Sequence, residues 1–203
     1  LDSAAQCYGI EVESVQTDAV QGLAVKLDIA ASCFQRLKSQ RRSLAGNTGC
    51  GLCGVESLAA LGPSLQVMPP QPWLAGLTVE TLLRASRALP DHQPLNRACG
   101  ALHAAAWVSP EGELLAVMED VGRHNALDKL LGQRARDSRL QEPGFVFMTS
   151  RASHELIRKC VRMGVGAMAA ISAPTDFAVD IAARSGLQLW GLVRGQRAVR
   201  YTR

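Results

Sequence analysis

The part of the sequence from about residue 101 onward alternates between segments typical of strands and segments typical of helices, and this limits the possible folds most. Short apolar runs predict strands at 102–108, 114–118, 145–149, 165–171, 187–193 and 198–201. Helical patterns at 123–131, 153–163 and 174–184 separate four of these runs. Such an alternation predicts a sheet that is partly parallel, with helices packed on its faces.

Capping residues predict where several of these elements begin and end. We expect Gly132 to close the first helix, Ser153 to cap the second, and Pro174 to occupy the first position of the third. Ahead of the alternating region, an amphipathic helix is expected at 78–89, with Thr78 as its N-cap.

The N-terminal part of the chain has a different organisation. Alternating apolar residues predict a half-buried strand at 22–30, followed by a basic helix at 32–44 and a glycine-rich loop at 46–54. We therefore divide the chain into a smaller subdomain, 1–98, and an α/β domain, 99–203.

The loop holds Cys50 and Cys53, which are separated by two residues and flanked by glycines. Such a pair serves as half of a zinc site, as a redox couple or as a sulfur carrier. A structural zinc site usually needs a second pair, and a thioredoxin-like centre needs a strand-to-helix junction, and the sequence offers neither. A carrier needs an accessible thiolate, which glycines and the basic residues at 36–42 would favour. The pattern favours sulfur carriage, with the other two interpretations left open.

Bulk properties exclude some classes of protein. The net charge of +4 is too small to indicate a dedicated nucleic-acid binder, and no apolar run is long enough to span a membrane. The N-terminal residues lack the pattern of a secretory signal, so we expect a reducing cytoplasm. The remaining cysteines, Cys7, Cys33, Cys99 and Cys160, are then expected to be small buried residues.

Polar residues follow the predicted strands at several places. The segments 150–151 and 172–175 both join a strand to a helix, where they serve either as phosphate sites or as ordinary N-caps. Arg194 and Arg197 flank a glycine turn, which would either grip phosphates or form a basic hairpin.

A third charged segment, MEDVGRHNALDKLLG, spans residues 118–132. Helical spacing places His124 with Asp128 on one face, and Asn125 with Lys129 on another. The segment is interpreted either as a salt-bridged helix start or as a ligand site. Zinc deaminase chemistry is not expected, because the glutamate of an H-x-E motif is missing after His124.

Taken together, these segments resemble the FdhD family of formate dehydrogenase accessory sulfurtransferases. The motifs that carry the resemblance are TGCGLCGVESL (48–58), HAAAW (103–107), EDVGRHNALDKLLG (119–132), SRASHEL (150–156) and SAPT (172–175). The resemblance implies a cytidine-deaminase-like mixed sheet flanked by helices, with a smaller N-terminal α+β subdomain. Family members usually carry a further segment before the position of Leu1, so this subdomain is expected to be truncated.

The resemblance also implies a function. Cys50 would carry a persulfide from a cysteine desulfurase to the molybdenum bis(molybdopterin guanine dinucleotide) cofactor that formate dehydrogenase requires, and Cys53 would support it. GDP is expected to mimic the cofactor. The residues expected to bind it are Leu192, Val193, Arg194, Gly195, Gln196 and Arg197. A homodimer without bound metal is expected, with no membrane or nucleic-acid partner. The alternative is a chaperone that binds the cofactor without moving sulfur.

Overall fold

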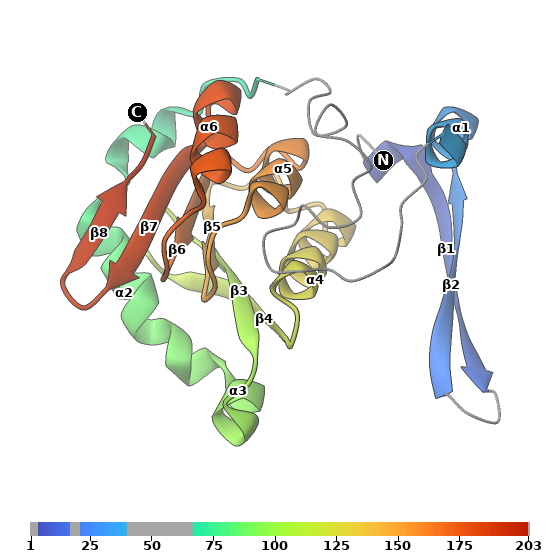
Figure 1. The fold of residues 1–203 in the computed structure, drawn as a ribbon, viewed down its shortest axis with the longest axis horizontal. Helices are drawn as coiled ribbons and strands as arrows, with labels where there is room; N and C mark the ends of the chain where they lie inside the picture. Colours follow the sequence, from blue (N-terminus) through green and yellow to red (C-terminus); the bar gives the residue numbers. More distant parts are fainter. Residues whose placement is uncertain (1–3, 17–20, 40–66, 203) are drawn as a thin grey trace.

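The computed structural model describes residues 4–16, 21–39 and 67–202, which form two separate sheets (Figure 1). The smaller sheet pairs β1 (Cys7–Gln16) with β2 (Gln21–Ile29). The larger contains β3 (His103–Val108), β4 (Leu114–Asp120), β5 (Phe145–Met148), β6 (Ala167–Ala170), β7 (Gln188–Arg194) and β8 (Arg197–Arg200). The α-helices are α1 (Ala31–Ser39), α2 (Val79–Ala88), α3 (Pro94–Cys99), α4 (Arg123–Arg136), α5 (His154–Arg162) and α6 (Asp176–Ser185). Short 3₁₀ helices are η1 (Ala4–Gln6), η3 (Pro72–Gly76) and η4 (Leu89–His92).

The six-stranded sheet is mixed, with the strand order β4-β3-β5-β6-β7-β8. Strands β5, β6 and β7 run parallel to one another, each joined to the next through a helix. Strand β3 runs antiparallel to both of its neighbours, and β8 runs antiparallel to β7. The predicted mixed sheet flanked by helices is confirmed.

Both faces of this sheet are buried, because successive residues of a strand point to opposite sides. Ala105 and Trp107 of β3 pack in a core with α4, α5 and α6, whereas Ala106 and Val108 pack on the other face with α2. The body is therefore a three-layer structure, with three helices on one side of the sheet and α2 on the other (Figure 1).

Two predicted helix ends are wrong. Gly132 lies inside α4, which continues to Arg136, because Leu130 and Leu131 hold this turn in the core. Pro174 precedes α6, whose N-cap is Thr175, because the proline forms a parallel bridge with Ala152 instead. The predicted start of α2 is confirmed.

The hairpin of β1 and β2 has an apolar face that is largely exposed. The register places Ile10 opposite Leu27 and Val12 opposite Val25, so these four side chains lie together. Each is more than half exposed, from 54% for Leu27 to 65% for Ile10. Strand β1 was not predicted, although its alternating residues carry the signal.

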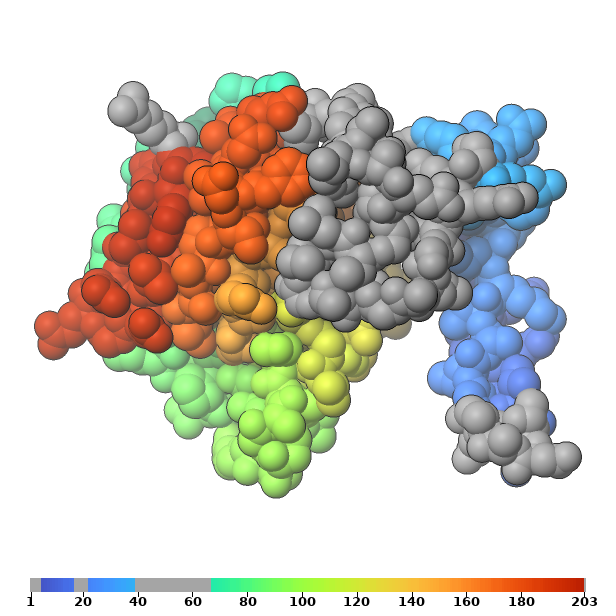
Figure 2. Space-filling view, viewed as in Figure 1, coloured from blue at the N-terminus to red at the C-terminus, as the bar shows by residue number. Residues whose placement is uncertain are grey.

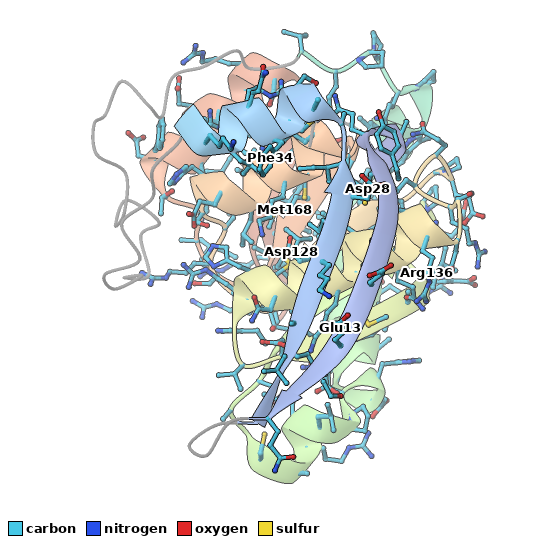
Figure 3. All side chains as sticks on the ribbon, turned by 90° about the vertical axis from the view of Figure 1, so that its right-hand side faces the viewer. Glu13, Asp28, Phe34, Asp128, Arg136 and Met168 are labelled. Atoms are coloured by element: carbon cyan, nitrogen blue, oxygen red, sulfur yellow. The ribbon has the colours of Figure 1, made fainter. Side chains whose placement is uncertain are left out.

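The opposite face of the hairpin is polar. Lys26 forms an ion pair with Glu13 at 2.6 Å, and Figure 3 shows Glu13 and Asp28 on the side directed away from the body. The hairpin itself stands apart from the six-stranded body (Figure 2). Within the described residues it is therefore held mainly by the pairing of its own two strands.

The predicted division of the chain at residue 99 stays a prediction. Helix α2, which precedes that position, packs against the six-stranded sheet through Leu82, Leu83 and Ala85. Among the helices that the structure describes, none has the length and apolar character needed to cross a membrane.

Two glycines give a matched test of this packing. A Cβ atom at Gly144 would lie 2.4 Å from Trp107 Nε1 and 2.7 Å from the carbonyl oxygen of Val108. We expect Gly144→Ala to lower the free energy of unfolding by about 2 kcal/mol or more, because the core cannot admit the methyl group. Urea denaturation with equilibrium fluorescence would measure this.

The control is Gly132→Ala, in the interior of α4, where an added Cβ atom meets nothing within 4 Å. It should raise the free energy of unfolding by roughly 1 kcal/mol, since alanine favours the helix. Equal stability of Gly144→Ala and the unsubstituted protein would contradict the packing described.

Candidate functional site

One edge of the six-stranded sheet collects most of the polar segments singled out in the sequence. Because β5, β6 and β7 are parallel, their carboxyl ends share this edge, and α5 and α6 begin there. The register of His103 with Asp120 brings the start of β3 and the end of β4 to the same edge, where α4 begins. It lies toward the bottom of the sheet in Figure 1, where the arrowhead of β7 points. Three helix N-termini therefore meet along one edge.

A histidine–carboxylate contact and an ion pair join the first two turns of α4 and α5. His124 Nε2 lies 2.7 Å from a carboxylate oxygen of Glu155, and Lys159 pairs with Asp128 one turn further along both helices. The predicted common face of His124 and Asp128 is thus confirmed. Both residues use that face to contact the neighbouring helix.

Most of the other charges in the segment 118–132 are also paired. The Asp120 carboxylate lies 2.6 Å from Lys129 Nζ, and it accepts hydrogen bonds from the Asn125 amide and from the backbone N–H of Gly122. These contacts, led by the hydrogen bond from Lys129, lower the pKa of Asp120. The interpretation as a salt-bridged helix start therefore explains these residues.

The first turns of α5 and α6 are also in contact. The ring of His154, which is 3% exposed, lies 4.9 Å from the ring of Phe177 between centroids. The backbone N–H of Thr175 donates to the carbonyl oxygen of Ala152 at 3.0 Å. Its side-chain oxygen accepts from the N–H of Ala178 at 3.2 Å. The segment 172–175 therefore acts as an ordinary N-cap.

Three histidines at this edge favour the neutral form. Burial lowers the pKa of His103 from its usual 6.5, and Arg123 lowers it further. Burial also lowers the pKa of His124, against the opposing effect of Glu155. The pKa of His154 is lowered chiefly by burial as well. Nearby arginines add to the effect of burial, because a neighbouring positive charge makes a histidine harder to protonate.

The end of β7 is irregular. Leu192 has a φ of +54°, a conformation that is uncommon for a residue with a branched side chain. It accompanies a bulge in the pairing with β8, and two hydrogen bonds fix it. The N–H of Leu192 donates to the carbonyl oxygen of Ser172, and the hydroxyl of Ser86 donates to the carbonyl oxygen of Val193. The segment is thus tied both to the loop after β6 and to α2.

The residues predicted to bind the cofactor lie at this bulge and in the turn that follows. The structure exposes four of them, namely Arg194, Gly195, Gln196 and Arg197. Val193 is fully buried in the core on the α2 side, so its side chain supports the sheet. Contact of this segment with a cofactor stays a prediction.

Cys50 and Cys53 lie outside the described residues. Of the other cysteines, Cys33 and Cys160 are buried as predicted. Cys99 is exposed, so its predicted burial is wrong: it ends the short helix α3 at the surface. Burial raises the pKa of Cys160 to about 12, which excludes this thiol as a carrier at neutral pH.

Several residues of the edge were not identified from the sequence. Glu155 and Phe177 complete the contacts between helices, and Ser86 reaches the bulge from a helix more than a hundred residues earlier. An acidic residue in the first turn of a helix is a recognisable signal for Glu155, but the contact of Ser86 has none. Across 4–16, 21–39 and 67–202, no group of three or more histidine, cysteine or acidic residues could hold a metal ion.

The fold defines an α/β protein, and this edge, with its helix N-termini and basic side chains, is its candidate site. The model of the FdhD/NarQ family matches residues 1–203, and the chain belongs to this family. It is 49% identical over 197 residues to the sulfur carrier protein FdhD of Variovorax paradoxus, which covers 97% of this chain and 68% of that protein. It is 48% identical to the sulfur carrier protein FdhD of Chromobacterium violaceum, covering 95% of this chain and 72% of that protein. The predicted family is confirmed.

A solved structure shows the same fold. The chain superposes on a protein from Desulfotalea psychrophila, described as a formate dehydrogenase accessory protein, with a TM-score of 0.58. The match covers 96% of both chains at 18% sequence identity. At this identity the likeness supports the fold alone.

The lowered histidine pKa values predict how stability depends on pH. A histidine that is harder to protonate in the folded protein takes up a proton on unfolding, so stability falls as the pH decreases below about 6.5. We expect the urea midpoint to decrease between about pH 7.5 and pH 5. Replacing the buried His154 by phenylalanine keeps a ring against Phe177 and should weaken this dependence.

His92→Gln is the control, since His92 is exposed in η4. The lowered pKa values of Asp120 and Glu142 act at lower pH, outside this window. A urea midpoint that stays constant across the window, or an equal effect of both substitutions, would contradict the assignment.

Proposed function

We propose that this protein carries sulfur for the maturation of formate dehydrogenase. The observation that supports it is the identity of 47–49% with three relatives named sulfur carrier protein FdhD, over 87–97% of this chain. Cys50 is the proposed carrier, a cysteine desulfurase the donor, and the molybdenum bis(molybdopterin guanine dinucleotide) cofactor the acceptor. Cys53 is proposed to assist.

The loading step is an exchange at sulfur. The thiolate of Cys50 attacks the outer sulfur of a persulfide on the desulfurase. A new S–S bond forms on Cys50, and the desulfurase cysteine leaves as a thiolate, so that no oxidant is needed. The sequence supports this step in two ways. Glycines beside Cys50 favour access to the thiol, and the basic residues at 36–42 favour its thiolate form.

The acceptor is proposed to bind at the carboxyl edge of the sheet. Ligands of such sheets bind beyond the carboxyl ends of the strands, and this edge offers Arg151, Arg194 and Arg197, all exposed. Guanidinium groups suit the phosphates of a dinucleotide. A homodimer in the cytoplasm completes the proposal, on the family resemblance alone.

Mapping the persulfide tests the carrier. When the protein is incubated with a cysteine desulfurase and cysteine, mass spectrometry should find one additional sulfur on Cys50, and Cys50→Ala should abolish both the label and the activation of formate dehydrogenase. Cys99→Ala, which removes an exposed thiol of α3, is the control and should retain both. Full activation by Cys50→Ala would favour the non-covalent chaperone instead.

Titration with GDP tests the predicted acceptor segment. We expect the double substitution Arg194→Ala with Arg197→Ala to weaken GDP binding roughly tenfold or more, because two charge-assisted contacts are lost. Isothermal calorimetry would measure the affinity. Arg184→Ala, at an exposed position of α6 that pairs with Asp180, is the control. Unchanged GDP affinity in the double variant would remove this segment from the site.

A further inference from the structure

Two neighbouring helices at the edge begin with the same kind of residue but use it differently. Thr175 caps α6, because its side-chain oxygen accepts a hydrogen bond from the N–H of Ala178. Ser153 occupies the same N-cap position of α5, with extended backbone angles, but it makes no such bond. The sequence predicted Ser153 as a cap and left 172–175 open between a phosphate site and an N-cap, and only Thr175 makes a side-chain cap bond.

The hydroxyl of Ser153 is both buried and unpaired. The residue is 2% exposed, and its Oγ has no hydrogen-bond partner among the residues that the structure describes. Leaving a buried hydroxyl unpaired costs about 1–3 kcal/mol, so such hydroxyls are rare in native proteins and call for a functional explanation. As the N-cap, this hydroxyl lies at the mouth of α5, beside the first-turn N–H groups that no intrahelical acceptor satisfies.

The surroundings of this helix start favour a negative charge. The first turn of α4 lies beside it, as the contact between His124 and Glu155 shows, so two helix dipoles present their positive ends together. Arg123 and Arg158 lie close enough to lower the pKa values of neighbouring histidines. Glu155 is the opposing charge, and it is engaged by His124.

The geometry points to a phosphate-binding site at the N-terminus of α5. Ser153 Oγ donates one hydrogen bond to a phosphate oxygen, and the first-turn N–H groups of α5 donate others. The exposed Arg151, two residues earlier, supplies charge. The inference rests on the proposed function in one respect: the phosphate belongs to the guanine dinucleotide acceptor. The N-terminus of α5 then binds phosphate, whereas the capped N-terminus of α6 has a structural role only.

Calorimetric titration of the full chain with GDP, inorganic pyrophosphate, inorganic phosphate and guanosine tests the site. Ser153→Ala should weaken binding of GDP and pyrophosphate roughly tenfold, by loss of one hydrogen bond to a charged group, and leave guanosine unaffected. Ser153→Gly removes the same hydroxyl and should give the same loss. A higher affinity for GDP than for inorganic phosphate supports a nucleotide as the source of the bound phosphate. Equal affinities overturn the link to the guanine dinucleotide acceptor.

The matched control removes a hydroxyl that does cap its helix. Thr78→Ala in α2 should lower the melting temperature and keep the affinity for GDP, since Thr78 accepts from the N–H of Thr81 far from the edge. Ser153→Ala should keep or raise the melting temperature, because its hydroxyl caps nothing. Unchanged binding of GDP and pyrophosphate by Ser153→Ala overturns the site, while persulfide formation on Cys50 is unaffected by that outcome. An equal loss of affinity in Thr78→Ala also overturns it.

Discussion

Burial of the central sheet on both faces decides where polar groups of this protein can lie. Strand β3 illustrates the constraint, because Ala104, Ala105 and Ala106 are fully buried and alternate between two separate cores. No charged side chain can be accommodated within such a strand without a partner. Polar residues are therefore confined to the strand ends, and the parallel run of β5, β6 and β7 gathers three helix starts at one of the two ends. The position of the candidate site is therefore a consequence of the sheet.

Charged residues at that edge serve two purposes, and the contacts separate them. Asp120, Asp128 and Glu155 are bound to basic partners on α4 or α5, so they set the relative positions of the helices. The arginines at 151 and 194 are exposed and the hydroxyl of Ser153 is buried without a partner, so these groups are suited to a ligand. Density of charge in a sequence therefore does not by itself distinguish a salt-bridged helix start from a binding site.

The sheet and most of its helices could be predicted from the sequence because their signals are local. Thr78 predicted the start of α2, and helical spacing alone predicted the common face of His124 and Asp128. The different use of Ser153 and Thr175 could not be predicted, since both are good capping residues and only the packing around them differs. The contact of Ser86 with the bulge depends on how α2 crosses the sheet, which no local pattern records.

The hairpin of β1 and β2 differs from the body in what holds it together, and this has a consequence for local opening. Its side chains contribute little buried apolar area, and a lone two-stranded hairpin is marginally stable in water. Its backbone amides should therefore exchange with deuterated solvent through local opening, whereas those of β5 and β6 exchange only when the whole body unfolds. In chain order the hairpin and α1 come before the cysteine pair, so the cysteines follow a part of the described fold that should open more easily than the central sheet.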